Sequence, residues 1–284
     1  MKSPDSVSAT AGDGTVIPLT WFDAKHPRCS LVFLPALGIQ SKLYSRLGAA
    51  LAERDVSVCL VEQRGHGASP VPVGRGTRFG IAELVEQDIP AVLEVAEARA
   101  PGLPLVLGGH SLGGHLSTLF AGIEPGRISG VAHVACGFPY YRDFPAHRAR
   151  LIRILCFLVS LAGWVPGYFP GRTIGFAGRE SIQLMRDWRG WALTGRFDYK
   201  GRKDAAELVS GFTGPVLSVS LDRDEFSSPA AVDRALSPFT QAVVEKVTLD
   251  ESHQGEYLGH FAWTREPEGV AEKLAEWSQR EVMA

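Results

Sequence analysis

The sequence predicts an α/β fold in which a mostly parallel sheet of eight strands is covered by helices on both faces. Short, continuously apolar runs alternate along the first half of the chain with segments whose apolar residues recur every three or four positions. Strands that are apolar throughout are typical of sheets buried on both faces. Repeated strand–helix–strand order at this spacing requires parallel strands joined by helical crossovers. The 284 residues, 45% of them hydrophobic, are sufficient for a large core.

The expected strands cover residues 7–10, 16–22, 31–34, 56–61, 103–107, 128–134, 215–221 and 242–249. The first two flank an Asp13-Gly14 turn, which predicts an antiparallel hairpin. Helices are expected from about residue 41, over 81–99, over 112–122, and near the C-terminus, where Val270, Leu274 and Trp277 share one face. Pro90 should bend the 81–99 helix or restart it behind an Asp88 cap.

This alternation stops between Gly137 and about Gly214, a stretch rich in Arg, Trp, Phe and Gly with helical patches and no convincing strand. We therefore expect a core formed by residues 1–136 and 215–284, with a helical cap of residues 137–214 inserted into it. Within this cap, the stripe of Leu184, Trp188, Trp191 and Ala192 is interpreted as an ordinary buried helix face and not as a cofactor site.

The longest uncharged apolar run, from Ile154 to Val165, also lies in the expected cap. It spans twelve residues, whereas a membrane-crossing helix needs about twenty. We therefore expect no transmembrane segment, and interpret the run as a buried or substrate-facing helix.

Charge and cysteine content argue against several classes of protein. With 29 Lys and Arg against 31 Asp and Glu, the net charge of −2 gives no overall basic excess that would favour nucleic acid or an anionic lipid surface. We therefore expect no nucleic-acid partner. Four separated cysteines without a C-x-x-C pair predict reduced core residues and neither a zinc site nor disulfides: Cys29, Cys59, Cys136 and Cys156. The polar N-terminus lacks the apolar stretch of a secretory signal, which predicts a cytoplasmic protein.

The strongest chemical signal is Gly-Gly-His-Ser-Leu-Gly-Gly over residues 108–114, between a predicted strand and a predicted helix. It contains the G-x-S-x-G pattern of a nucleophile elbow, in which Gly109 and Gly113 leave room for a tight turn around Ser111. Such a turn lifts the serine hydroxyl above the carboxyl edge of the sheet and directs the helix N-terminus at a bound acyl oxygen. The pattern predicts Ser111 as a nucleophile.

With this elbow, the sequence resembles the α/β-hydrolase superfamily over nearly the whole chain, in its serine-hydrolase branch with a helical cap. Residues 62–69, Glu-Gln-Arg-Gly-His-Gly-Ala-Ser, are similar to the family loop D-x-R-G-x-G-x-S, with Glu62 where Asp is usual. The resemblance implies the α/β-hydrolase fold. A serine at the elbow argues against the dehalogenase and epoxide-hydrolase branches, which place Asp there. We interpret Arg64 and His66 as side chains that hold this loop through hydrogen bonds.

The resemblance also implies the chain order serine, acid, histidine, with the base in the loop before the last helix. A neutral imidazole can accept the serine proton. Two histidines lie in that region, and His260, in Leu258-Gly259-His260, is closer to the family pattern. We prefer His260, and His253 remains the alternative, more naturally an exposed loop residue.

Several carboxylates compete for the third position, which orients the imidazole. After the 216–221 strand, the sequence offers Asp222, Asp224 and Glu225. The family form D-x-x-x-x-P aligns best with Asp224, and Asp222 remains open as an alternative. Asp143, which follows the preceding strand, is a weaker rival.

Two backbone N–H groups are expected to bind the oxyanion of a tetrahedral intermediate. One belongs to Leu112, the residue after the nucleophile. The other follows the 31–34 strand, where relatives often carry His-Gly and this chain has Pro35-Ala36-Leu37. Alignment selects Leu37, with Ala36 as the neighbouring alternative, since Pro35 has no N–H to donate.

Together, these features predict a metal-free, cofactor-independent serine hydrolase that cleaves a small-molecule carboxylic ester or thioester through an acyl-serine. An acyltransferase using the same acyl-serine is the alternative, and a hydrolase-like receptor without turnover is less favoured. The apolar cap residues would form a chamber for an acyl chain or only pack the cap onto the core, and both interpretations stay open. Arg148, Arg150 and Arg153 could meet a carboxylate or phosphate headgroup, although a solvated helix face is the simpler interpretation. Substrate identity and oligomeric state are not specified by the sequence.

Overall fold

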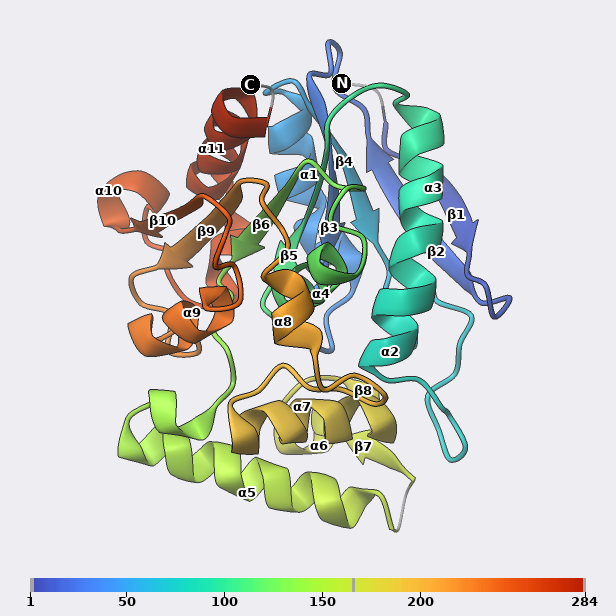
Figure 1. The fold of residues 1–284 in the computed structure, drawn as a ribbon, viewed down its shortest axis with the longest axis vertical. Helices are drawn as coiled ribbons and strands as arrows, with labels where there is room; N and C mark the ends of the chain where they lie inside the picture. The colour runs from blue at the N-terminus through green and yellow to red at the C-terminus, as the bar shows by residue number, and fades with distance from the viewer. Residues whose placement is uncertain (1–2, 165–166, 283–284) are drawn as a thin grey trace.

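One eight-stranded sheet organises the computed structural model, which describes residues 3–164 and 167–282 (Figure 1). Its strand order is β1 (Asp5–Thr10), β2 (Val16–Phe22), β4 (Val56–Val61), β3 (Cys29–Leu34), β5 (Leu105–His110), β6 (Gly130–Val134), β9 (Val216–Leu221) and β10 (Val244–Leu249). The β1–β2 and β2–β4 pairs are antiparallel, and the other neighbours are parallel. The predicted fold class and the β1–β2 hairpin are therefore confirmed.

Helices cover both faces of the sheet because successive side chains of its buried strands point to opposite sides. Leu31 and Phe33 of β3 pack in the core beneath α1 (Ser45–Ala52) and α11 (Glu268–Trp277). Val32 and Leu34 pack in the core on the other face. Helices α3 (Ile89–Arg99), α4 (Leu112–Ile123), α8 (Ala205–Val209) and α9 (Pro229–Leu236) contribute to that second core.

The expected helix over 81–99 runs without a break, but its hydrogen-bonding pattern changes along its length. It comprises α2 (Ile81–Glu83), a π-helical turn η2 (Leu84–Asp88) and α3, with Pro90 in the first turn of α3. The prediction of an Asp88 cap was wrong, because Asp88 has helical backbone angles and makes no side-chain capping bond. Its carboxylate instead accepts hydrogen bonds from Arg64, at 2.8 and 2.9 Å from Nε.

The segment between β6 and β9 carries helices beyond the carboxyl ends of the strands (Figure 1). It contains η3 (Tyr141–Asp143), α5 (Ala146–Ala162), α6 (Gly171–Ile174), α7 (Ile182–Thr194) and α8. Helices α5 and α7 share a small core of their own, which includes Leu155, Val159 and Met185. Helix α8 packs against α4 at Gly122, where a β-carbon would meet the backbone of Val209.

A short antiparallel ladder of β7 (Tyr168–Pro170) and β8 (Arg179–Ser181) also lies in this segment. The expectation that residues 137–214 contain no strand was wrong. Three residues per strand are too few for an alternating pattern to be visible in the sequence.

The remaining short helices are η1 (Ser41–Tyr44), α10 (Glu251–Gln254), η4 (Ala262–Arg265) and η5 (Ser278–Val282). Within residues 3–164 and 167–282, the helices are all too short or too polar to cross a bilayer.

Candidate active site

The turn between β5 and α4 holds Ser111 in a conformation that few residues other than glycine adopt. Its φ of 52° and ψ of −111° place it in the left-handed half of backbone space. A β-carbon on Gly109 would lie 2.6 Å from the carbonyl oxygen of Leu34, and one on Gly113 would collide with the same oxygen. Two glycines are required here because β3 passes directly beneath the turn.

Hydrogen bonds fix this turn at the carboxyl edge of the sheet. The N–H of Ser111 donates to the Val134 carbonyl at 3.0 Å, at the end of β6. The Ser111 carbonyl accepts from Gly114 N at 3.0 Å and from His115 N at 3.3 Å, which starts α4. The serine is thus held at the N-terminus of a helix, where unpaired N–H groups and the helix dipole favour negative charge.

His260 and Asp224 form a buried pair next to this turn. His260 Nδ1 lies 2.8 Å from Asp224 Oδ2, and the two residues are 9% and 7% exposed. The second carboxylate oxygen accepts the N–H of Phe226 at 2.8 Å. A carboxylate can only accept, so Nδ1 carries the proton and Nε2 of the neutral imidazole is left as the basic nitrogen.

The competing residues lie in other surroundings. Asp222 is exposed, and Glu225 forms an ion pair with Arg148. Asp143 pairs with Arg234. His253 is exposed, with Nδ1 2.8 Å from Asp250 Oδ1. Of the carboxylates and histidines weighed from the sequence, only Asp224 and His260 contact each other within the part of the chain that the structure describes.

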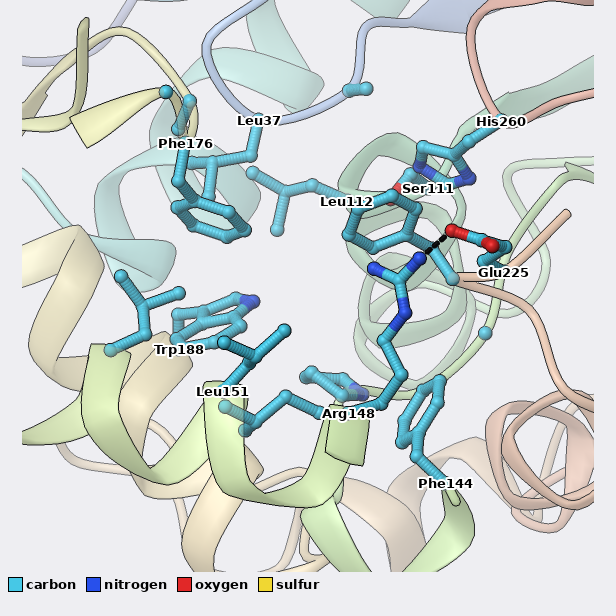
Figure 2. Close-up of a pocket in the computed structure, with 18 of the residues that line it drawn as sticks. Leu37, Ser111, Leu112, Phe144, Arg148, Leu151, Phe176, Trp188, Glu225 and His260 are labelled. Atoms are coloured by element: carbon cyan, nitrogen blue, oxygen red, sulfur yellow. Dashed lines mark ion pairs between the residues drawn. The ribbon is translucent and has the colours of Figure 1, made fainter. Parts of the chain in front are cut away.

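Ser111 and His260 line the same pocket and point into the same end of it (Figure 2). No hydrogen bond joins the Ser111 hydroxyl to His260 among the described residues. Such bonds are often long without substrate and tighten in the complex. The arrangement therefore brings a hydroxyl, a basic nitrogen and a paired carboxylate to one edge of the sheet.

The loop after β3 contributes Ala36 and Leu37 to the same pocket, where Leu112 also lies. The N–H of Ala36 is already used, because it donates to the Tyr44 hydroxyl at 3.1 Å. Between the two neighbours that the sequence left open, Leu37 is therefore the one with an N–H free of this bond. Tyr44, 1% exposed, was not identified from the sequence, since no motif marks it.

The loop of residues 62–69 is held by buried polar side chains. Glu62 accepts from Ser41, at 3.0 Å from both its N–H and its hydroxyl. Arg64 bonds Asp88 and, at 2.7 Å, Asp13. His66 Nε2 lies 3.1 Å from Glu180 Oε2, which is fully buried in the segment between β6 and β9. Arg64 and His66 thus have the loop-holding contacts that were expected of them.

A cavity of about 400 Å³ extends from Ser111 along α5. This volume falls in the range of small-molecule sites. Its walls are mainly apolar, from α5, α7 and the chain near α6: Leu151, Ile152, Ile154, Leu155, Leu158, Ile174, Phe176 and Trp188. Trp188 therefore both packs and faces the pocket, whereas Leu184 and Trp191 of the same stripe are fully buried.

The apolar run of Ile154–Val165 is only partly explained by burial. Leu155 and Leu158 face the cavity, but Phe157, Leu161 and Trp164 are 62%, 49% and 87% exposed. Val165 lies outside the described residues. The expectation of a buried or substrate-facing helix was thus wrong for the outer side of this run.

Arg148 is the one member of the predicted arginine cluster that lines the cavity. Its guanidinium pairs with Glu225 and lies 5.1 Å from the centre of the Phe226 ring, so it borders the pocket next to His260 (Figure 2). Arg150 and Arg153 are exposed on α5.

Buried neutral groups surround the reactive end of the pocket. Burial lowers the pKa of His110 well below the usual 6.5, and His260 lies close enough to add to this effect. Burial also lowers the pKa of His115 to about 4, although its hydrogen bond to the Gly137 carbonyl opposes this. Burial raises the pKa of the Cys136 thiol. Cys136 is therefore held as a thiol that packs against His115, as expected of a core residue.

Within the described chain, no cluster of three His, Cys, Asp or Glu side chains is arranged to hold a metal ion. The fold and this site define a member of the α/β-hydrolase superfamily. The family model described as Hydrolase_4, serine aminopeptidase S33, matches residues 25–175. The chain belongs to this family.

Curated relatives match over a limited length. Human monoglyceride lipase is 26% identical over 117 residues, which cover 40% of this chain and 37% of the lipase. An abhydrolase domain-containing protein of Dictyostelium discoideum is 29% identical over 117 residues, or 41% of this chain and 12% of that protein. The chain thus spans well under half the length of either relative.

Solved structures share the fold over almost the whole chain. Est1E of Butyrivibrio proteoclasticus, solved with ferulic acid, has a TM-score of 0.69 at 17% identity and covers 98% of this chain and 100% of its own. A thermostable carboxyl esterase of Bacillus coagulans has a TM-score of 0.70 at 13% identity and covers 99% of this chain and 100% of its own.

Proposed function

We propose that this protein is a serine hydrolase that cleaves a carboxylic ester or thioester through an acyl-serine intermediate. The observation that carries the proposal is the buried 2.8 Å contact of Asp224 with His260, in one pocket with the strained Ser111. Family membership and the similarity to monoglyceride lipase support a hydrolase of esters. No metal or cofactor enters the proposed mechanism.

In this mechanism, the Ser111 oxygen attacks the carbonyl carbon while its proton passes to His260 Nε2. Asp224 accepts a hydrogen bond from Nδ1–H, which stays on the ring, and so stabilises the imidazolium that forms. The N–H groups of Leu37 and Leu112 donate to the oxyanion. Collapse of the tetrahedral intermediate expels the alcohol or thiol, which takes the proton from His260.

The acyl-enzyme is then hydrolysed by the reverse sequence of transfers. Water loses a proton to His260 Nε2 and attacks the acyl carbon, and the carboxylic acid leaves as Ser111 regains its proton. The nearby His110, which burial keeps neutral, adds no positive charge that would oppose formation of the imidazolium.

We further propose that residues 137–214 act as a cap whose inner surface accepts an apolar acyl group. The cavity wall formed by Leu155, Leu158 and Trp188 supports this choice, because burying an apolar chain there releases ordered water. Leu158→Trp should fill the cavity and shorten the longest ester that is hydrolysed.

A fluorophosphonate probe tests the nucleophile directly. Wild type should be labelled and Ser111→Ala should not. Ser210→Ala removes a half-buried hydroxyl that is bonded to the Glu207 carbonyl and does not line the pocket, so this variant should label like wild type. Labelling that survives in Ser111→Ala would refute the assignment. An ester series of increasing acyl length, measured with added alcohol, then separates hydrolysis from acyl transfer, because a transferase forms the new ester in preference to the acid.

A further inference from the structure

Helix α5 carries two apolar strips, of which the protein covers only one. Its inner face, with Leu155, Cys156 and Val159, is buried against α7. Its outer face carries a second apolar row at helical spacing, with exposed fractions of 46–62%: Leu151, Ile154, Phe157 and Leu161. Trp164 continues this row just beyond the helix and is 87% exposed. We call these five residues the α5 outer row. A large exposed apolar patch of this kind marks an interaction surface.

The chain segment that carries this row is positively charged. Residues 144–179 contain five arginines and no Asp or Glu, although the whole chain has a net charge of −2. Arg150 and Arg153 are exposed on α5 itself, and Arg172 is exposed on α6. Arg148 is matched by Glu225 at the pocket, so the exposed arginines supply the local excess. The overall charge conceals this asymmetry, because the acidic residues lie elsewhere in the sequence.

The outer row is continuous with the mouth of the pocket. Leu151 and Ile154 belong to the row and also line the cavity that holds Ser111. Ile174 of α6, 45% exposed, lines the same cavity. An apolar chain could therefore pass from the outer row into the pocket without crossing a polar rim at these residues.

We propose that the α5 outer row docks this protein on the surface of an anionic phospholipid bilayer. Apolar and aromatic side chains on one side of a helix, flanked by arginines, are the combination that holds a helix in the interface of such a bilayer. Tryptophan is favoured at this depth, because its ring is apolar with one polar N–H. Delivery of a lipid ester to Ser111 would rest on the proposed function, whereas docking itself requires no catalysis.

Vesicle sedimentation tests the docking surface with two double variants and two matched controls. Phe157→Ser with Trp164→Ser removes apolar area, and Val243→Ser is its control, since Val243 is 69% exposed just before β10. Arg150→Glu with Arg153→Glu reverses charge, and Lys25→Glu with Arg28→Glu applies the same charge change to exposed residues before β3. Both controls lie at the amino edge of the parallel strands, opposite the pocket.

Wild type should bind phosphatidylcholine vesicles that contain phosphatidylglycerol at least about fivefold more tightly than vesicles of phosphatidylcholine alone, the effect of roughly one basic residue near the membrane. The arginine reversal should abolish this preference. The apolar variant should lose about tenfold or more in binding to both vesicles. The controls should bind like wild type. Added salt should reduce the preference for vesicles that contain phosphatidylglycerol and leave binding to pure phosphatidylcholine unchanged.

Further measurements separate docking from activity and from self-association. Ser111→Ala should bind vesicles like wild type, so an error in the proposed nucleophile would leave this result intact. Neither double variant touches the pocket lining, so hydrolysis of a soluble short ester should persist in both. Docking would be refuted if wild type bound neither kind of vesicle, or if both α5 double variants bound the vesicles as tightly as wild type. A wild-type dimer that the apolar variant converts to monomer, without vesicle binding, would identify the row as a self-association surface and also overturn the proposal.

Discussion

The Tyr44 hydroxyl and Nδ1 of His110 are hydrogen-bonded over 2.9 Å, both buried beneath the serine turn. The same hydroxyl accepts the N–H of Ala36 at 3.1 Å. One phenol thus joins the loop that carries Leu37 to the residue before Ser111. No sequence motif marks this link, which connects the loop after β3 and the helix η1 to the end of β5.

Tyr44→Phe should lower kcat by about tenfold with little change in KM, because Leu37 would be less firmly held for the oxyanion. It should also destabilise the fold by roughly 1–3 kcal/mol, since it leaves two buried polar groups unpaired. Steady-state kinetics and urea unfolding measure the two effects. Tyr257→Phe, far from this link in the sequence, is the control. An unchanged kcat in Tyr44→Phe would mean that the Tyr44 hydroxyl does not position the loop for catalysis.

The Glu62 carboxylate occupies the space that a side chain at position 67 would need. A β-carbon on Gly67 would collide with the Glu62 carboxylate, which bonds Ser41, and the φ of Gly67 is 48°. Gly67→Ala should therefore destabilise the protein by about 2 kcal/mol or more.

A double variant tests whether this collision is the cause. Glu62→Asp shortens the side chain, so Gly67→Ala should cost less when combined with Glu62→Asp than it does in wild type. Urea unfolding of the four proteins in this cycle gives the coupling energy. Equal costs with and without Glu62→Asp would attribute the effect to backbone strain alone.

Asp224→Asn should reduce kcat by about 10³-fold to 10⁴-fold with KM little changed, because an amide does not hold His260 in the required tautomer or stabilise its charged form. Asp222→Asn should remain near wild type, since Asp222 is exposed. Initial rates on a soluble ester, with folding checked by circular dichroism, measure the difference. Comparable losses in both variants would contradict the proposed role of Asp224.

His133 should make the protein sensitive to acid. Burial lowers its pKa to about 3, with a further effect of nearby His115. Below pH 6.5 the unfolded chain therefore binds a proton at this site that the folded chain does not bind. The contribution to stability is complete above about pH 6.5 and is lost as the pH falls towards about 3.

When the pH is lowered from 7 to about 4.5, the free energy of unfolding should fall in both proteins. The fall should be about 2 kcal/mol smaller in His133→Gln than in wild type, because Gln does not titrate. Thr118→Val is the control, because Thr118 bonds His133 Nε2 at 2.9 Å but does not titrate. The control should be less stable at both pH values with the wild-type dependence on pH. Urea unfolding at the two pH values measures this, and equal pH dependence in His133→Gln and wild type would exclude the expected contribution.

Local patterns in the sequence were sufficient to predict the sheet, its hairpin and the elbow. Strands buried on both faces are continuously apolar, and the glycines on either side of Ser111 reflect a close approach that allows no side chain. The β7–β8 ladder was missed because it is too short to show a period. Asp88 was misread as a cap because its partner, Arg64, lies 24 residues away in the sequence.

What the sequence determined by itself was the class of fold and the identity of the elbow serine, since both depend on neighbours along the chain. Only the tertiary structure decided which carboxylate contacts His260, which N–H of the 35–37 loop is already bonded, and which side of α5 is left uncovered. Each of these depends on side chains brought together from distant segments. Local periodicity and turn chemistry carry no information about such contacts.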